Sequence, residues 1–544
     1  MKHLHIILLL SVFFFSCKSK KEAGLLVYNA SIYLVDSAFS MAEAMVISDG
    51  KILATGNRAT LETEFNAKET LDAGGKFIYP GFIDAHAHFA GYGQSLLKVD
   101  LNGTASWEDC LEKVKAFAKA HPEGWITGRG WDQNDWTVKK FPDNSRLNEL
   151  FPDRPVLLTR VDGHAAIANE KALNLAGLKP DTRLTGGEVL TANGRLTGLL
   201  IDNAVDLVSN QLPAADKKNL KEALQAAEKN CFAAGLTGIT DCGLSFSTVE
   251  TIKELQTAGD LKMRLNILLS DAPENYQYAL EKGPYSSDRL RVAGFKVYGD
   301  GALGSRGACL LHPYSDLPGH TGFLLSSKEH FDSVAAWMFE KRWQLCTHAI
   351  GDSGNRVILQ TYARYLKAGN DLRWRIEHAQ VLHPDDFSLF GQYAIIPSVQ
   401  PTHATSDMYW AGERLGAERE KGAYAYRQLL EQNGWLPLGT DFPVEDISPF
   451  KTFYAATIRK DAKGWPEGGY LPANSLSREQ ALRGMTIWAA KAGFEEKMKG
   501  SLEKGKWADF VIVDTDLMQA DAGKLLNAKV LYTFLAGEKV YSAK

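Results

Sequence analysis

The stretch Tyr79–His88 reads YPGFIDAHAH, a Pro-Gly turn followed by an apolar run that ends in two histidines. Residues i and i+2 of a strand point to the same face, so the imidazoles of His86 and His88 can bind one metal ion if this run is a strand. The pattern alone is weak, because two of the 13 histidines can fall at this spacing by chance. On these residues alone, a metal site and a structural or surface pair both remain open.

Apolar runs that alternate with amphipathic stretches continue through most of the chain, and this rhythm predicts an α/β fold with a parallel sheet covered by helices. The runs expected to be strands are Ile78–Ala85, Leu236–Cys242, Arg264–Leu269, Gly294–Tyr298, Gln344–Thr347, Trp374–Glu377, Ala394–Val399 and Trp435–Gly439. Eight such strands indicate a closed (β/α)8 barrel of the TIM type, which we expect to occupy residues 80–500.

The segment between the first and second expected strands is too long for a single crossover. About residues 96–212 are therefore predicted to be a large insertion after the first barrel strand, with secondary structure of its own. The segment Lys217–Ala234 is amphipathic and is expected to be the helix that leads into the second strand.

Both ends of the chain have a different texture, with short apolar runs separated by turn residues. Residues 25–79 contain several such runs, and Asp49-Gly50 between two of them is a hairpin signal. Residues 501–544 repeat this texture. We expect the two segments to form one small β-sandwich that is built from both chain ends.

The first 17 residues are similar to a secretion signal. Lys2 precedes the apolar run Leu4–Phe15, which is too short to span a bilayer, so the protein is expected to be exported. Ser16-Cys17 resembles a bacterial lipobox, in which the cysteine is lipidated. Residues 18–24 would then be a tether, and the protein would be lipid-anchored to a bacterial membrane, on its periplasmic or its outer side. A cleaved signal with an incidental Cys17 remains the alternative.

The composition describes a folded globular chain of 544 residues, with 45% hydrophobic and 23% charged residues. A net charge of -4 gives no bulk attraction to nucleic acid or to anionic lipid, so a small-molecule substrate is the expected partner. Six cysteines without a CxxC pair do not indicate a disulfide framework. The oligomeric state is left open.

Four more polar residues fall at the expected strands. Lys296 lies inside the apolar run Gly294–Tyr298, where an unpaired ammonium is costly to bury. His348, His378 and Asp441 each follow a different expected strand. Barrel enzymes place their catalytic groups at the carboxyl ends of the strands, so these residues are predicted to share one site with the two histidines described above.

This order of HxH, Lys, His, His and Asp resembles the amidohydrolase superfamily. Further motifs are similar to its amidohydrolase-3 branch, which includes N-substituted formamide deformylases. The residues that carry the resemblance are Pro80–His88 (PGFIDAHAH), Lys296–Ser305 (KVYGDGALGS), His348–Asp352 (HAIGD), Glu377–Ala379 (EHA), Gly439–Asp441 (GTD) and Gly505–Asp509 (GKWAD). Ser353-Gly354 departs from the usual pattern of the branch.

The resemblance implies a metal-dependent hydrolase that cleaves a C–N bond of an amide or formamide-like compound, other than a peptide bond, by attack of a metal-activated hydroxide. The implied ligands are His86, His88 and Asp441 for the more buried of two divalent metals, His348 and His378 for the other, and a carbamate of Lys296, formed with CO2, between them. Zinc suits such imidazole-rich ligands, and manganese or iron remain open. Asp441 is expected to move the proton of the water to the leaving nitrogen, and burial is expected to lower the pKa of Lys296 and so promote its carbamylation.

Four residues are predicted to contact the substrate, and each also has a purely local interpretation. Trp131 would form an aromatic wall or pack in a core, and His164 would reach over the metal mouth or serve within the insertion. Asp300 follows Lys296 closely, and His403 falls in a loop after the seventh expected strand, where it faces either the site or solvent.

Two other functions fit parts of the sequence. Gly351–Gly354 (GDSG) resembles the nucleophile loop of chymotrypsin-like proteases, but those are all-β proteins and this stretch follows an expected metal ligand on a βα pattern. A non-catalytic ligand-binding lipoprotein on an amidohydrolase scaffold is the second alternative. All the expected ligands are present, so the sequence gives no sign of lost catalysis.

Overall fold

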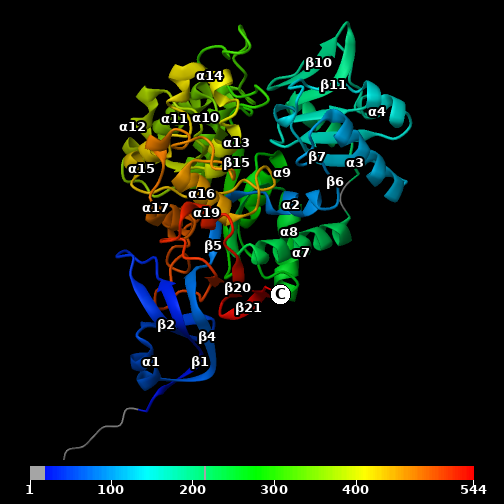
Figure 1. Ribbon diagram of the computed structural model, residues 1–544. Coiled ribbons are helices and arrows are strands. Elements are labelled where there is room, and N and C mark those ends of the chain that lie inside the picture. Colours follow the sequence, from blue (N-terminus) through cyan, green and yellow to red (C-terminus); the bar gives the residue numbers. More distant parts are fainter. Residues whose placement is uncertain (1–18, 214–215, 544) are drawn as a thin grey trace, which may run out of the picture.

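The computed structural model describes residues 19–213 and 216–543, which form three sheets and the helices around them (Figure 1). The predicted signal segment 1–17, with Cys17, lies outside the described residues. The predicted tether is wrong in part, because residues 21–24 already belong to a strand that pairs with Phe65–Ala67. Within the described part of the chain, no helix is both long enough and apolar enough to cross a bilayer.

The central sheet is a nearly closed parallel barrel of seven strands, with one short antiparallel strand, β14 (Tyr285–Ser286), at its side. Its strands, in chain order, are β5 (Phe82–Ala87), β12 (Leu236–Leu244), β13 (Arg264–Ser270), β15 (Leu290–Tyr298), β16 (Gln344–Ala349), β17 (Arg375–His378) and β18 (Ile396–Ser398). Each pairs in parallel with its neighbour. The predicted α/β class and parallel barrel arrangement are confirmed for these seven strands.

Helices between the strands cover the outside of the barrel (Figure 1). The larger ones are α7 (Lys217–Ala233), α8 (Phe246–Ala258), α9 (Pro273–Lys282), α10 (Lys328–Lys341), α11 (Asp352–Tyr365), α13 (Pro401–Asp407), α14 (Ala411–Glu420), α15 (Tyr426–Asn433), α16 (Pro449–Ile458), α17 (Arg478–Gly484) and α18 (Ile487–Ala492). Helix α7 follows the predicted helix 217–234 within one residue. Its buried face is made of apolar residues at helical spacing, including Leu220, Leu224 and Ala227.

The eighth predicted strand, Trp435–Gly439, is wrong. Only Leu438 forms a bridge, in parallel with Val399, and its carbonyl accepts a hydrogen bond from Ala85 N at 3.1 Å. Pro437 has no N–H to donate, and the N–H of Leu438 is directed to Gly484 O at 3.0 Å. This segment therefore links β18 to β5 without forming a strand of its own.

The first predicted barrel strand begins too early, because Ile78 pairs with Ile512 in a different sheet. That sheet joins both ends of the chain in the order β21-β20-β19-β4-β1-β2-β3. Its strands are β1 (Lys21–Tyr33), β2 (Met41–Ser48), β3 (Lys51–Gly56), β4 (Phe65–Pro80), β19 (Phe510–Val513), β20 (Val530–Leu535) and β21 (Glu538–Ser542). Asp49 (φ 51°) and Gly50 (φ 74°) form the predicted hairpin turn between β2 and β3. The sandwich packing of this terminal sheet stays a prediction.

A buried ion pair fastens the terminal sheet to the barrel. Arg264, at the start of β13, lies with Nε 2.7 Å from Asp509 Oδ2 and Nη2 3.0 Å from Oδ1. The same Oδ1 also accepts a hydrogen bond from Ala536 N at 2.7 Å. Bidentate geometry and full hydrogen bonding are the conditions under which a buried charge pair is tolerated.

A third sheet lies between β5 and β12 in the sequence, in the segment predicted to be the insertion, and stands beside the barrel in Figure 1. Its strands are β6 (Val99–Asp100), β7 (Ile126–Trp131), β8 (Val156–Arg160), β9 (Ala165–Ala168), β10 (Gly187–Ala192) and β11 (Arg195–Asp202), and its main helix is α3 (Trp107–Ala120). It has a core of its own, with Leu111, Val114 and Leu158 fully buried. Most of the apolar packing of this insertion sheet comes from the insertion itself, and Phe323 of the barrel domain packs against it.

Candidate metal centre and cavity

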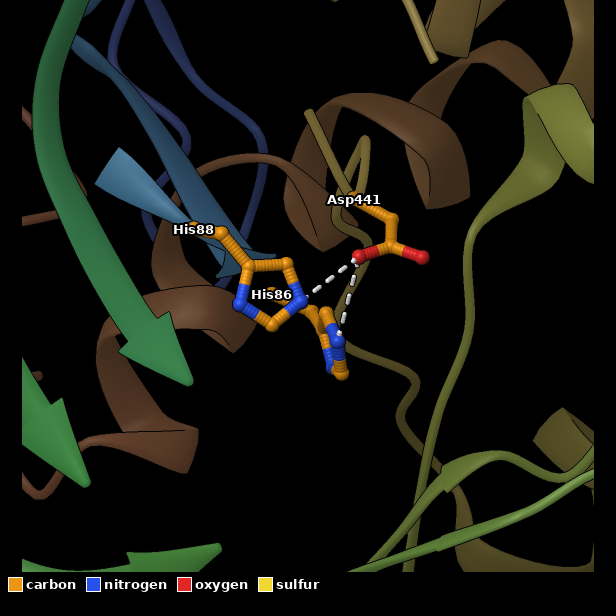
Figure 2. Close-up of side chains that lie close together, drawn as sticks. All are labelled: His86, His88 and Asp441. Atoms are coloured by element: carbon orange, nitrogen blue, oxygen red, sulfur yellow. Dashed lines mark ion pairs between the residues drawn. The ribbon is translucent and has the colours of Figure 1, made fainter. Parts of the chain in front are cut away.

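The two histidines of the HxH motif lie beside Asp441, as Figure 2 shows. His86 is in the fully buried strand β5, and His88 precedes helix α2 (Phe89–Ser95). Asp441 Oδ1 lies 3.4 Å from His86 Nε2 and 3.2 Å from His88 Nε2. The loop after the Leu438 bridge therefore brings Asp441 to the carboxyl end of β5, as the sequence predicts.

Both imidazoles lie within ion-pairing distance of Asp441 (Figure 2). Asp441 Oδ1 is buried and has no hydrogen-bond partner among the described residues, although both imidazole nitrogens are near. A buried carboxylate oxygen without a partner is costly. Two imidazoles and a carboxylate form a donor set that suits zinc or a similar divalent metal. The residues present therefore fit a metal ion at this point.

A second ring of imidazoles adjoins this group. His348 in β16 and His378 at the end of β17 have ring centroids 4.5 Å apart, and His378 also lies 4.9 Å from His86. His378 Nδ1 is buried without a hydrogen-bond partner among the described residues. Burial lowers the pKa of both His348 and His378 well below the usual value, which keeps them neutral, as metal ligands must be.

The backbone is strained at two of these positions. His378 has φ 74° and Asp441 has φ 66°, in the left-handed region that residues other than glycine seldom adopt. Such strain gathers at functional sites, where the surrounding structure holds a side chain in a required direction. Here it directs both side chains toward the same centre.

Lys296 is buried in β15, where the sequence places it, and its Nζ lies 3.4 Å from His86 Nε2. Burial lowers the pKa of this amine, but the neighbouring acidic groups Tyr298, Cys242, Glu377 and Asp441 outweigh burial and raise the pKa above the usual value. The prediction that burial sets a lowered pKa for Lys296 is therefore wrong. Lys296 lies at the candidate metal centre because strand β15 places it next to His86.

Glu377, next to His378 in β17, belongs to the EHA motif, but the sequence predicts no role for its side chain. Its Oε2 lies 2.5 Å from His86 Nδ1, and its Oε1 forms a 2.8 Å ion pair with Arg375 Nε. Both side chains are fully buried. Burial raises the pKa of Glu377, but Arg375 and His86 together outweigh burial and lower this pKa to about 2. This carboxylate fixes the His86 ring with Nε2 toward Asp441, a support that ligand histidines commonly have.

His403, in α13, contacts the other oxygen of Asp441. Its Nε2 lies 3.2 Å from Asp441 Oδ2 and its Nδ1 lies 3.0 Å from Glu445 Oε1. Burial lowers the pKa of His403, but the two carboxylates outweigh this and raise it to about 10. The structure therefore places this predicted substrate contact at the site, as a charged group beside Asp441, and adds Glu445, which sequence reasoning missed.

A cavity of about 620 Å³ opens over the metal centre. Barrel residues form its floor, including Lys296, His348 and Asp441, and insertion residues form part of its wall. A cavity of this size matches those that hold small organic ligands. The site thus lies between the carboxyl end of the barrel and the insertion.

His164 lines this cavity from the insertion. Its Nδ1 lies 2.5 Å from Asp202 Oδ1, and its ring centroid is 5.0 Å from that of His348. This placement agrees with the prediction that His164, from the insertion, reaches over the candidate metal centre. Asp202 itself was not singled out in the sequence.

Two other predicted substrate contacts lie away from the cavity and are wrong in this structure. Trp131 is fully buried in the core of the insertion, where its indole N–H donates to Leu158 O at 2.8 Å. Asp300 is also fully buried, and its carboxylate accepts backbone N–H groups of Cys309, Ile350 and Gly351. It positions the loop after His348 instead of meeting a ligand.

Comparison with known proteins agrees with this site. A family model described as "Amidohydrolase family" matches residues 69–541. Protein LONG AFTER FAR-RED 3 of Arabidopsis thaliana is 35% identical over 95% of this chain and 92% of its own. The N-substituted formamide deformylase of Arthrobacter pascens is 26% identical over 94% of this chain and 97% of its own.

A solved structure agrees in fold and sequence. It is an uncharacterized metal-dependent hydrolase from Pyrococcus horikoshii OT3, with a TM-score of 0.75 and 27% identity over 92% of this chain and 99% of that one. The family match covers most of the described residues, including every predicted metal ligand. The chain therefore belongs to the amidohydrolase family and is a hydrolase.

Proposed function

We propose that this hydrolase cleaves the C–N bond of a small amide or formamide-like compound, other than a peptide bond. The observation that carries the proposal is the convergence of His86, His88 and Asp441, with an unpartnered buried oxygen, at one cavity, which His88 and Asp441 line. The name of the formamide deformylase relative supports the choice of bond.

The donor atoms divide into two groups around Lys296. His86, His88 and Asp441 would hold one divalent metal, His348 and His378 the other, and Lys296 as a carbamate would lie between them. Zinc is the metal that this proposal assigns, because the donors are mainly imidazole nitrogens. When bound, such metals polarise a substrate carbonyl and make a bound water acidic enough to attack it near neutral pH.

The chain itself supplies proton transfer and orientation. Asp441 Oδ1 faces the metal ligands, so this carboxylate is placed to take a proton there and to pass it to the leaving nitrogen. His403 holds Asp441 Oδ2 at 3.2 Å and thereby fixes the plane of the carboxylate. Glu377 fixes His86 from the other side. Residues of the insertion, including Arg129 and His164, line the same cavity.

Metal content tests the proposed ligand set directly. Protein without residues 1–17 is expected to hold about two divalent metals per chain by elemental analysis, and Lys296→Ala is expected to hold clearly fewer. Lys282→Ala, at an exposed position in α9, is the matched control and should keep the full content. About one metal in both proteins would remove the bridging role of Lys296.

The same preparation decides between catalysis and mere ligand binding. Retained metal together with hydrolysis of N-acyl or formamide compounds supports the proposal. If no metal is retained after reconstitution with zinc and bicarbonate, the proposal fails and a ligand-binding lipoprotein becomes the better description.

We also propose that the chain is exported and lipid-anchored through Cys17, on the basis of the sequence before the described residues. Expressed in a bacterium, the full chain is expected to enter the detergent phase on Triton X-114 partition, with a mass increase of a lipid group on Cys17. Cys17→Ala should stay in the aqueous phase or remain uncleaved. An unmodified Cys17 in the mature wild-type protein would contradict the anchor.

A further inference from the structure

The cavity wall carries two cationic side chains that have no acidic partner. Lys98 follows α2 and Arg129 lies in β7, and both line the cavity. No carboxylate of the described residues comes within 4 Å of either charged group, since neither takes part in an ion pair. Cations that are half-buried in a functional cavity and lack a partner are typical of a site for an anionic ligand.

The other cations of the cavity do not share this property. Arg160 is held between Asp132 and Asp162 by two ion pairs, so its charge is already neutralised. Lys296 lies among the metal ligands. Lys98 and Arg129 are thus the two lining cations whose charge is left for something that enters the cavity.

Arg129 has hydrogen-bonding capacity to spare. Its Nη2 donates to Val161 O at 2.8 Å, while its Nε is buried without a hydrogen-bond partner among the described residues. Gly163 (φ 78°) leaves room beside the guanidinium, since a Cβ at that position would lie 3.4 Å from both terminal nitrogens. The backbone therefore orients Arg129 through one bond and leaves the rest of its planar fork free.

The two cations act on each other. Burial and the positive charge of Arg129 lower the pKa of Lys98, and burial lowers the pKa of Arg129. Two like charges repel, and an anion that contacted both would relieve that repulsion. The charge of Asp441 also acts on Arg129, and both cations line the same cavity as Asp441.

Carboxylates line the cavity as well. Asp135, Asp407 and Glu445 act on one another, since Glu445 raises the pKa of both aspartates, although burial is the larger cause. Asp162, from the insertion, acts on Arg129, but its carboxylate is already paired with Arg160. An anionic group of a substrate would be repelled by the first three carboxylates and attracted by Lys98 and Arg129.

We propose that Lys98 and Arg129 form a carboxylate subsite, and that the substrate is a small amide that bears a free carboxylate. The inference rests on the proposed C–N hydrolysis and names the substrate class for it. The carboxylate belongs either to the acyl part of the amide or to the amine part, and both arrangements use the same two cations. Charge-assisted, fork-like hydrogen bonds from Arg129 suit a carboxylate well.

The test compares charged with neutral amides on the metal-loaded protein. N-acetylalanine carries the carboxylate on the amine side and succinamate carries it on the acyl side, with N-ethylacetamide and propionamide as neutral counterparts. We expect kcat/KM to favour one of the two carboxylates over its neutral counterpart. In Arg129→Gln and in Lys98→Gln this preference should fall by about 10- to 100-fold, the loss expected for a charge-assisted bond.

Controls separate charge from folding. Arg195→Gln changes an exposed arginine of the same insertion and should leave the preference unchanged. Arg129→Lys should restore part of it. If Arg129→Gln does not fold, Lys98→Gln, at a residue outside the sheets and helices, carries the test. A preference for neutral amides in wild type, or one that neither variant alters, would overturn the subsite.

Binding measured by calorimetry distinguishes this proposal from the proposed function. If N-acetylalanine or succinamate binds in an Arg129-dependent manner but no amide is hydrolysed, the C–N chemistry fails and the carboxylate subsite stands. If amides are hydrolysed but neither carboxylate binds more tightly than its neutral counterpart, the subsite fails and the C–N chemistry stands.

Discussion

Replacement of Asp441 by Asn is expected to lower kcat for amide hydrolysis by about 10³-fold or more. The carboxylate oxygen Oδ1 faces His86 and His88 without a partner, so it is placed to be a metal donor, and it is the proton acceptor in the proposed reaction. The Asn carboxamide has no negative charge and is far less basic, so it cannot accept that proton. Steady-state kinetics with the best N-acyl substrate measures the effect.

Asp446→Asn is the matched control, since Asp446 lies five residues further on and forms an exposed ion pair with Lys451. Its kcat should remain within about twofold of wild type, as surface ion pairs contribute little. Metal analysis of Asp441→Asn shows whether lost activity follows lost metal. A variant that keeps more than a tenth of the wild-type kcat would exclude Asp441 as the proton acceptor.

Glu377→Gln is expected to affect both metal and stability. Metal affinity should fall by about 10- to 100-fold, because His86 loses the carboxylate that fixes its ring. The free energy of unfolding should fall by about 3–5 kcal/mol, because Arg375 then remains as a fully buried cation without a charged partner. Competition with a metal chelator and urea unfolding of the metal-free protein measure the two effects separately.

The same variant should change how stability depends on pH. The folded protein holds the pKa of Glu377 at about 2, below the unfolded value. Its contribution is therefore complete above the ordinary carboxyl pKa and is lost as the pH falls toward 2, and Gln has no such dependence. Glu431→Gln, which breaks an exposed pair with Arg427, should change stability by less than about 1 kcal/mol. Equal losses in the two variants would contradict the role of burial.

The barrel and the placement of the candidate ligands at one end of it could be predicted from the sequence because both follow from short-range rules. Apolar runs of strand length alternate with helical patterns, and His348, His378 and Asp441 stand at the ends of such runs, where parallel strands meet. The failure at Trp435–Gly439 has a local chemical cause in Pro437 and a distant one in Gly484, whose carbonyl takes the N–H of Leu438. The distant partner has no signal in a single sequence.

The supporting groups were harder to predict because their roles depend on what lies around them. Arg375 and Glu377 are charged residues two apart in an apolar run, which was a usable signal for a buried pair. Their neighbours in the sequence suggest that Trp131 and Asp300 contact a ligand. In the structure Trp131 is buried in the core of the insertion, and the carboxylate of Asp300 is buried and accepts hydrogen bonds from three backbone N–H groups. Lys98 and Arg129 stand out only once the absence of an acidic partner is known.

The terminal sheet can be completed only late in the synthesis of the chain. Strand β4 is made early and leads directly into the barrel, but its neighbour β19 is synthesised only after the whole barrel. Until then β4 presents an open edge, the kind of surface on which nascent chains pair wrongly. Asp509 and strand β19 thus complete the ion pair with Arg264 and the sheet only after the barrel has been synthesised. A chain that ends before Asp509 would contain every candidate metal ligand but would lack both β19, the partner of β4, and the ion pair that links the terminal sheet to the barrel.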